Sequence, residues 1–308
     1  MSAPRQIPIV CPGHTRPLAE LQFCQHATDG TFLMSACHDK SPMIRRGDTG
    51  DWIGSFVGHK GAVWSAKLDR QCNLAATASG DFSARLWDGI TGACLTTWTH
   101  RHIVKTVEFS PGSTELATGG HEGVLRVFDL NRYKEDKAKT QVTVGGDSGK
   151  ANITKLAWGS SADLENLVIA SDSKGRVSAY DVRSMKEARS VSVEGGVMDM
   201  ELNEDLGRLT VSAGKKVTVF NTKDFGTLKE FDMPISFAEE GGCSMDPSGK
   251  KFVAGGSDLW VRVFDYETGE CLETNKGHHG PVRCVRFNPD GGQYATGSED
   301  GTIRIWRS

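Results

Sequence analysis

Short runs of alternating apolar and polar residues recur along the whole chain and predict β-strands. The clearest unit lies at the C-terminal end. An apolar run at Val282–Phe287 is followed by small residues at Ala295–Ser298, an acidic turn at Ser298–Gly301 and a β-branched and aromatic run at Thr302–Trp306. Glycine suits the positive φ of such a turn, and β-branched residues favour strands. We expect Ala295–Ser298 to be small because it lies in an inner strand crowded around an axis.

The same unit recurs at a nearly constant interval. Its last strand usually ends in an aromatic residue followed by Asp, and a first, weaker copy ends near Arg46-Gly47-Asp48. With that final position as a ruler, the intervals are 40, 41, 52, 40, 44 and 42 residues, measured between Gly47, Trp87, Phe128, Tyr180, Phe220, Phe264 and Trp306. This is the period of WD40 repeats, which have four strands per unit. We therefore predict an all-β, seven-bladed WD40 β-propeller that forms a single domain over residues 1–308.

Two segments depart from the regular repeat. The longest interval contains the polar and charged stretch Asn131–Lys139, which we expect to be an insertion in a surface loop between blades three and four. The last unit ends at Trp306 after three strands, and Gln6–Val10 precedes the first complete unit. We expect this N-terminal segment to supply the fourth strand of the last blade and so close the ring. Pro8 is compatible with an outer edge strand.

A Gly-His pair precedes the apolar run in the clearest copies and predicts a buried hydrogen-bond relay. The His would bridge the turn Asp and a strand hydroxyl, and a Trp indole N–H would donate to that hydroxyl. The predicted members are His59, Asp81, Thr77 and Trp87 in blade two, and His278, Asp300, Thr296 and Trp306 in blade seven. A catalytic triad combines the same groups, but recurrence at the repeat period favours a structural network.

The remaining blades carry weaker versions of this relay. Blade three offers His100, Glu122 and Thr118, with Phe128 in place of the indole donor. Blades four, five and six lack the His, and we predict that they are the less stable blades.

The composition of the chain makes several classes of function less favourable. The formal charge is −3, from 36 Lys and Arg against 39 Asp and Glu, which argues against nucleic-acid binding through bulk positive charge. Met1–Cys11 lacks the apolar run of a signal peptide, and no stretch approaches the ~20 apolar residues of a membrane span. None of the eight cysteines forms a C-x-x-C pair, so we expect reduced, buried thiols. We expect a protein of the cytoplasm and nucleus that has no contact with membranes.

Two short stretches resemble enzyme motifs. Gly146-Asp147-Ser148-Gly149 is similar to the nucleophile motif of trypsin-like proteases, but no matching His motif accompanies it. Gly145–Lys150 lacks the spacing of a phosphate-binding loop, and Ala151 stands where that loop has a metal-binding hydroxyl. We expect no catalytic residue, no cofactor and no metal ion.

Binding of protein partners is the function that remains for a propeller without catalytic residues. Residues just past each Gly-His pair should lie on the top face of the propeller, and those with side chains suited to an interface are Arg16, Lys60, Trp64, His102, Lys105, His279 and Arg283. Trp64 is either an exposed anchor or an inter-blade packing residue. Lys60, Lys105 and Arg283 form either a basic rim around the channel or ordinary solvated surface.

Three stretches go beyond the general repeat: Arg46–Phe56 with Gly58–Trp64, His102–Val107, and His279–Val282 with Cys284–Phe287. In these the chain resembles the family of serine-threonine kinase receptor-associated proteins, also called Unr-interacting proteins. We expect a protein that is monomeric alone and does not bind nucleic acid directly. The resemblance implies a scaffold with several partners. It implies as partners the SMN-complex components that assemble spliceosomal ribonucleoproteins, an Unr-like RNA-binding protein in translation and, in animals, receptor kinases and Smads, with inhibition of TGF-β signalling.

Two other interpretations remain open. The propeller subunit i of translation initiation factor three shares the fold and a Gly-His-x-Gly-Ala-Val-Trp segment, although Arg46–Phe56 favours the first family. A propeller enzyme or small-ligand binder would need acids, bases or metal ligands that converge at the channel mouth. We expect no such cluster at repeat-related positions.

Overall fold

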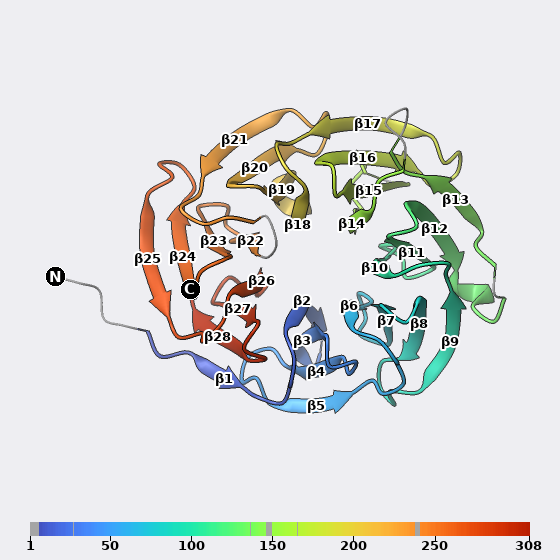
Figure 1. Cartoon of the computed structure of the whole chain (residues 1–308), viewed down its shortest axis with the longest axis horizontal. Helices are drawn as coiled ribbons and strands as arrows, with labels where there is room; N and C mark the ends of the chain where they lie inside the picture. Colours follow the sequence, from blue (N-terminus) through green and yellow to red (C-terminus); the bar gives the residue numbers. More distant parts are fainter. Residues whose placement is uncertain (1–5, 27, 136, 146–149, 165, 238–240) are drawn as a thin grey trace.

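Seven four-stranded antiparallel sheets surround a central channel in the computed structural model (Figure 1), which describes residues 6–26, 28–135, 137–145, 150–164, 166–237 and 241–308. The predicted all-β, seven-bladed propeller is therefore confirmed. Within the described residues, the helices are two short 3₁₀ turns, η1 (Leu130–Arg132) and η3 (Glu204–Leu206). None of the helices described is long and apolar enough to span a membrane.

Each blade places its first strand at the channel and its fourth at the rim (Figure 1). The innermost strands are β2 (Leu18–His26), β6 (Val63–Leu68), β10 (Val104–Phe109), β14 (Ile153–Trp158), β18 (Val197–Asn203), β22 (Gly242–Met245) and β26 (Val282–Phe287). The second strands are β3 (Gly30–Cys37), β7 (Leu74–Ser79), β11 (Glu115–Gly120), β15 (Leu167–Asp172), β19 (Arg208–Ala213), β23 (Lys251–Gly255) and β27 (Gln293–Ser298).

The third strands are β4 (Met43–Arg46), β8 (Ser83–Asp88), β12 (Val124–Asp129), β16 (Arg176–Asp181), β20 (Lys216–Asn221), β24 (Trp260–Asp265) and β28 (Ile303–Arg307). The outer strands are β5 (Trp52–Ser55), β9 (Cys94–Thr99), β13 (Thr140–Thr143), β17 (Glu187–Ser192), β21 (Thr227–Asp232), β25 (Cys271–Lys276) and β1 (Ile9–Cys11).

The chain ends close the ring as the sequence predicts. Strand β1 pairs antiparallel with β28, with Ile9 opposite Ile305 and Cys11 opposite Ile303, and so completes the last blade. This pairing satisfies the backbone groups at the outer side of β28 and removes an exposed edge from that blade. Pro8 lies just before the strand.

The hydrophobic core lies between neighbouring blades. Between blades two and three, for example, Ala76 and Leu86 from one sheet pack with Val107 and Phe128 from the next, and the Trp98 ring stacks on Phe128 at 4.6 Å. Neighbouring sheets therefore interdigitate and bury side chains on both of their faces.

The register corrects three positional predictions. Ala295–Ser298 belongs to β27, a second strand, and it is small because a Cβ on Gly297 would lie 2.7 Å from Cys284 Sγ in the adjacent inner strand. Asn131–Lys139 follows β12 and leads to β13, so it lies within blade three. In blade one the aromatic position is occupied by Arg45, which pairs with Leu33 as Trp87 pairs with Ala75. The position predicted from the sequence, Gly47, lies two residues after Arg45. The prediction was wrong because blade one has no aromatic side chain at this position.

The expectation that the cysteines are buried holds for six of the eight. Cys94 and Cys271 are exposed on outer strands, whereas the other six cysteines are buried. Two tryptophans also lie at the surface, because Trp52 is 60% exposed and Trp260 is 38% exposed. Trp158 is buried in its inner strand. The stretch Gly146–Gly149 lies outside the described residues.

Candidate functional site: the channel and the top face

The structure brings the members of both predicted relays together. In blade two, His59 Nδ1 lies 2.9 Å from Asp81 Oδ2, His59 Nε2 lies 2.6 Å from Thr77 Oγ1, and Trp87 Nε1 donates to the same hydroxyl at 2.9 Å. Trp87 can only donate and the carboxylate can only accept. A neutral His59 that donates through Nδ1 and accepts from the Thr77 hydroxyl therefore satisfies every group.

Blade seven repeats this geometry. His278 lies 3.2 Å from Asp300 and 2.8 Å from Thr296, and Trp306 donates to Thr296 at 2.9 Å. Burial lowers the pKa of His278, which keeps the ring neutral. Burial would raise the pKa of Asp300, but hydrogen bonds from His278 and the His279 backbone hold that pKa well below its usual range. Both relays lie inside their blades. The hydrogen bonds within them give their His, Asp, Thr and Trp members a structural role.

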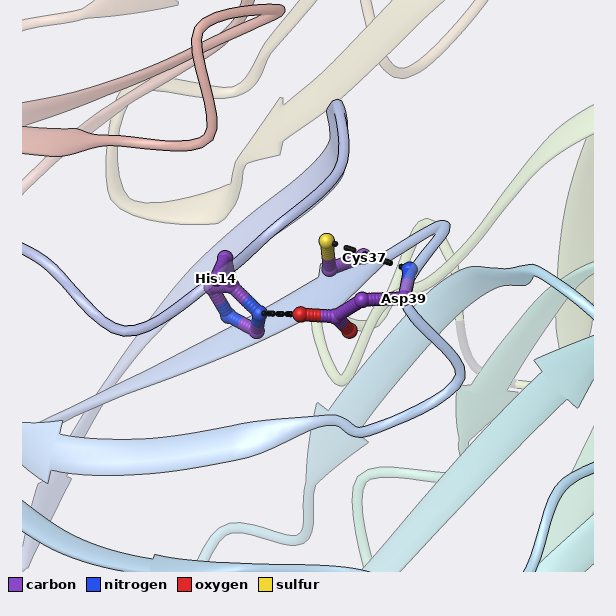
Figure 2. A group of neighbouring side chains, drawn as sticks. All are labelled: His14, Cys37 and Asp39. Atoms are coloured by element: carbon purple, nitrogen blue, oxygen red, sulfur yellow. Dashed lines mark hydrogen bonds and ion pairs between the residues drawn. The ribbon is translucent and has the colours of Figure 1, made fainter.

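Blade one contains a further relay that the sequence analysis did not identify (Figure 2). His14 Nδ1 lies 2.7 Å from Asp39 Oδ2, and His14 Nε2 lies 2.9 Å from Ser35 Oγ. Potential ligand atoms of Cys37, His14 and Asp39 lie within 4.8 Å of one another, but burial raises the pKa of the Cys37 thiol to about 12, and both ring nitrogens of His14 already have partners. The group is thus explained as a relay. Gly13-His14 and the acidic turn at Asp39 were the available sequence signals.

Blade three keeps only half of the predicted contacts. His100 Nε2 lies 2.9 Å from Thr118 Oγ1, but His100 Nδ1 lies 3.2 Å from the carbonyl oxygen of Trp98. The Glu122 carboxylate is bound by both terminal nitrogens of Arg126, at 2.7 and 2.8 Å. Glu122 therefore anchors its own hairpin.

The inner strands line the channel with three rings of side chains. In six blades the strand pairing skips one residue near the start of the inner strand, and that bulge directs an extra side chain toward the channel mouth. The top ring is Ala19, Trp64, Lys105, Thr154, Met198, Gly241 and Arg283. The middle ring is Glu20, Ser65, Thr106, Lys155, Asp199, Gly242 and Cys284, and the lower ring is Gln22, Lys67, Glu108, Ala157, Glu201, Ser244 and Arg286.

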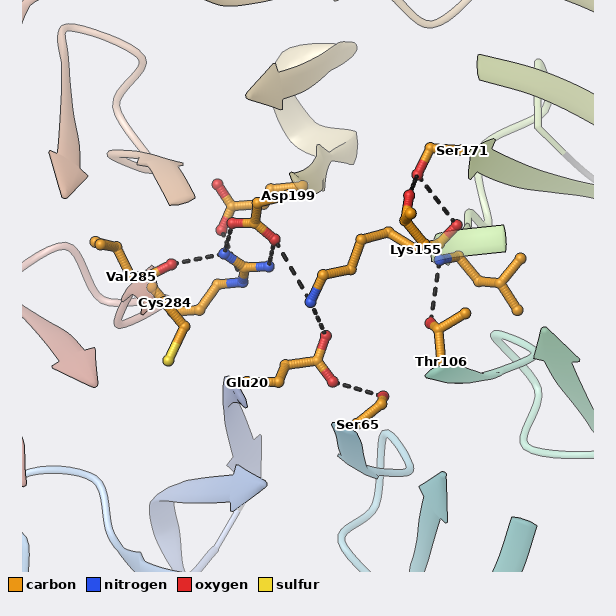
Figure 3. Close-up of polar contacts among 12 residues, drawn as sticks. Glu20, Ser65, Thr106, Lys155, Ser171, Asp199, Cys284 and Val285 are labelled. Atoms are coloured by element: carbon orange, nitrogen blue, oxygen red, sulfur yellow. Dashed lines mark hydrogen bonds and ion pairs between the residues drawn. The ribbon is translucent and has the colours of Figure 1, made fainter. Parts of the chain in front are cut away.

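Opposite charges join the middle and lower rings across the channel (Figure 3). Lys155 Nζ lies 2.9 Å from Glu20 and 3.7 Å from Asp199, and Arg286 binds both oxygens of Asp199 at 2.6 and 2.8 Å. Lys67 lies 3.5 Å from Glu20. These contacts connect the inner strands of blades one, two, four, five and seven.

The pairing sets the ionisation of the buried groups. Burial would raise the pKa of Glu20, but Lys155, Lys67 and a hydrogen bond from Ser65 lower it to about 2. Burial raises the pKa of Glu108 and of Glu201. Four carboxylates therefore face three cations in these two rings, and each carboxylate lies within 4 Å of at least one of these cations.

This charged cluster corrects the expectation that no such group occupies repeat-related positions. Lys67, Glu108, Glu201 and Arg286 occupy equivalent places in four blades. The alternation of charged and apolar residues in the inner strands was a signal for it, but the sequence does not show which charges meet across the channel.

The top ring has a different character. It surrounds a cavity of about 310 Å³, which is also lined by His121, Lys155 and Asp199. Lys105 Nζ lies 3.1 Å from the centroid of the Trp64 ring, and the His38 ring meets Trp64 edge-on at 4.3 Å. Burial, Lys155 and Arg283 lower the pKa of Lys105 to about 7. The basic groups of the described top ring are therefore Lys105 and Arg283.

The seven predicted partner-binding residues fall into two groups. Trp64, Lys105 and Arg283 are half-buried and line the cavity, where Arg283 also lies 4.0 Å from Glu299. The other four are exposed and do not line the cavity: Arg16, Lys60, His102 and His279. The rim predicted from Lys60, Lys105 and Arg283 thus keeps only its last two members. Trp64 is half-buried against His38 and Lys105.

Comparison with known proteins agrees with this architecture. The family model described as "WD domain, G-beta repeat" matches residues 50–88, 92–129 and 269–307. Each matched segment begins at the outer strand of one blade and ends with the third strand of the next. The sequence repeat is therefore offset from the structural blade by one strand, which is the offset that lets β1 close the ring.

Proteins similar along nearly the whole chain are also known. The "Serine-threonine kinase receptor-associated protein" of Dictyostelium discoideum is 41% identical over 301 residues, which cover 97% of this chain and 98% of that protein. The protein of the same name from Homo sapiens is 42% identical over 306 residues, covering 99% of this chain and 84% of the human one. The "Eukaryotic translation initiation factor 3 subunit I" of Culex quinquefasciatus is 29% identical over 326 residues, covering 97% and 95%.

Proposed function

The chain belongs to the serine-threonine kinase receptor-associated protein family of WD40 propellers, and from this premise we propose that it is a non-enzymatic adaptor that holds protein partners in one complex. The likeness at 41% identity over 97% of the chain carries this proposal, because it includes all seven blades and not just the three regular repeats. The charge pairing in the channel supports a structural rather than a catalytic use of its buried acids.

The proposed partners are those that membership of this family implies. They are SMN-complex components in the assembly of spliceosomal ribonucleoproteins, an Unr-like RNA-binding protein in translation and, where the organism has them, receptor kinases and Smads of TGF-β signalling. The relatives' name itself carries association with a serine-threonine kinase receptor. These partners would be met in the cytoplasm and the nucleus.

Affinity purification of the tagged protein from its own cells, followed by mass spectrometry, tests the proposal. We expect SMN or Gemin proteins in the eluate. A Trp64→Ala variant is purified in parallel, because Trp64 lines the top cavity and its loss should weaken a partner held there. Recovery of initiation-factor subunits in place of SMN components would favour the relationship at 29% identity and overturn the partner assignment.

A further inference from the structure

Among the described residues, one basic group at the channel mouth, Lys105, has no acidic partner. Lys67, Lys155 and Arg286 each pair with carboxylates lower in the channel, whereas no carboxylate of the described residues lies within ion-pair distance of Lys105. The Lys105 ammonium rests on the Trp64 ring instead, at 3.1 Å from its centroid. A half-buried ammonium without an anion favours a ligand that supplies one.

The neighbours of Lys105 strengthen this preference. Arg283 in the same ring and Lys155 in the ring below add positive charge to the cavity. His38 and His121 flank it, and burial together with Lys105 lowers the pKa of both rings, that of His38 to about 4. Among the described residues that line the cavity, Asp199 is the acidic one, and Arg286 already binds both of its oxygens.

An exposed aromatic surface leads to this cavity. Phe82 is 42% exposed and has a φ of 67°, at a turn position that is Lys40 in blade one and Gly in blades three, four and seven, at Gly123, Gly175 and Gly301. A bulky side chain in this region of φ is strained, and here it presents an aromatic ring to solvent. The Phe82 ring lies 5.5 Å from that of His102.

The aromatic row continues to the cavity edge, because the His102 and His121 rings lie 5.3 Å apart and His121 lines the cavity. We propose that this top face of blades two and three binds an acidic peptide segment of a protein partner. A carboxylate of the segment enters the cavity beside Lys105 and Arg283, and an apolar side chain of the same segment packs on Phe82 and His102. The inference rests on the proposed adaptor function and names the chemistry of its partner.

The observations favour a peptide over a nucleic acid. The cavity of about 310 Å³ is sized for one or two side chains and has two cations in its upper ring, whereas nucleic-acid sites follow a backbone with an extended basic stripe. The isolated aromatic patch next to a cation also matches interface hot spots, which combine aromatic anchors with charge.

Selection from a random dodecapeptide display library on the whole protein tests the proposal. We expect enrichment of Asp or Glu beside Leu or Phe on the unmodified protein and loss of that enrichment on Lys105→Met. Lys215→Met is the control, because Lys215 is an exposed lysine on the turn between β19 and β20 of blade five and does not line the cavity. Equal enrichment on all three proteins, or enrichment of basic sequences, would overturn the site.

Fluorescence anisotropy of the enriched peptide then separates its two contacts. We expect at least tenfold weaker binding by Lys105→Met and by a peptide with Gln for Glu. Phe82→Gly should weaken binding several-fold while raising the melting temperature, because it removes the strained φ. A Phe82→Gly protein that binds the peptide as tightly as the unmodified protein would exclude the aromatic contact. Circular dichroism melts verify that each variant is folded.

The pH dependence adds a signature that a merely structural lysine would not give. Only protonated Lys105 attracts a carboxylate, so affinity should fall about tenfold between pH 6 and 8 as Lys105 titrates near 7. Lys105→Met should abolish this dependence. Tighter binding of a labelled single-stranded RNA through the same lysine would overturn the peptide assignment.

The same variant distinguishes this site from the broader function. Partners recovered equally by the unmodified protein and Lys105→Met would refute the site and leave the adaptor proposal standing. Recovery of no specific partner even by the unmodified protein would refute the adaptor proposal itself.

Discussion

Arg286 is expected to be the most costly single side chain to remove from the channel. Its guanidinium binds both oxygens of Asp199 across the channel and lies 3.9 Å from Glu201, and all three residues are largely buried. Arg286→Met would leave a buried Asp199 whose nearest cation is Lys155, at 3.7 Å. Removing one partner of a buried pair typically costs about 3–5 kcal/mol, because an uncompensated charge stays behind.

For a chain of 308 residues this loss corresponds to a melting temperature lower by roughly 5–8 °C. Circular dichroism melts and urea unfolding measure it. The double variant Arg286→Met with Asp199→Asn should recover much of the loss, since neither charge remains. Arg183→Met is the surface control: its partner is Asp181 at 2.8 Å, but the arginine is 69% exposed, so about 0–1 kcal/mol is expected. A cost below about 1 kcal/mol for Arg286→Met, or strictly additive single losses, would refute the reasoning.

Three further predictions concern the blades. Thr77→Val should cost about 2–4 kcal/mol in urea unfolding, because the buried groups of His59 and Trp87 both lose their partner; a cost of a few tenths would mean that the relay is not structural. Amide hydrogen exchange should be faster in β19 than in β7, since the hydroxyls of Thr210 and Ser212 are buried without partners and blade five has no His; equal protection would contradict this. Mild oxidation should join Cys24 to Cys72, whose sulfurs lie 2.6 Å apart, with a mass loss of ~2 Da per disulfide; two intact thiols after treatment would count against it.

The order of strands within each blade can be predicted from the sequence, because most repeat units carry recognisable marker residues. Gly-His, an acidic turn and a terminal aromatic recur at one period, and three side chains suffice to place a relay such as that of His59, Thr77 and Trp87. The unpaired N-terminal strand predicts closure by counting alone, and β1 lies where that count requires. Where the markers are absent the register slips, as it does at Arg45, which holds an aromatic position without being aromatic.

Tertiary structure alone decided what the inner strands do together. Each strand shows its charges on alternate residues, but the sequence cannot tell that Lys155 meets Glu20, 135 positions away, or that Arg286 meets Asp199. Closure of the ring brings these residues to one axis, so the pairing depends on the relative rotation of blades that share no local contacts. The same closure places Lys105 at the mouth, where no carboxylate of the described part of the chain lies within ion-pair distance. The sequence therefore determines the type of each side chain and its position in a strand. Its electrostatic partner is determined only when the ring of blades closes.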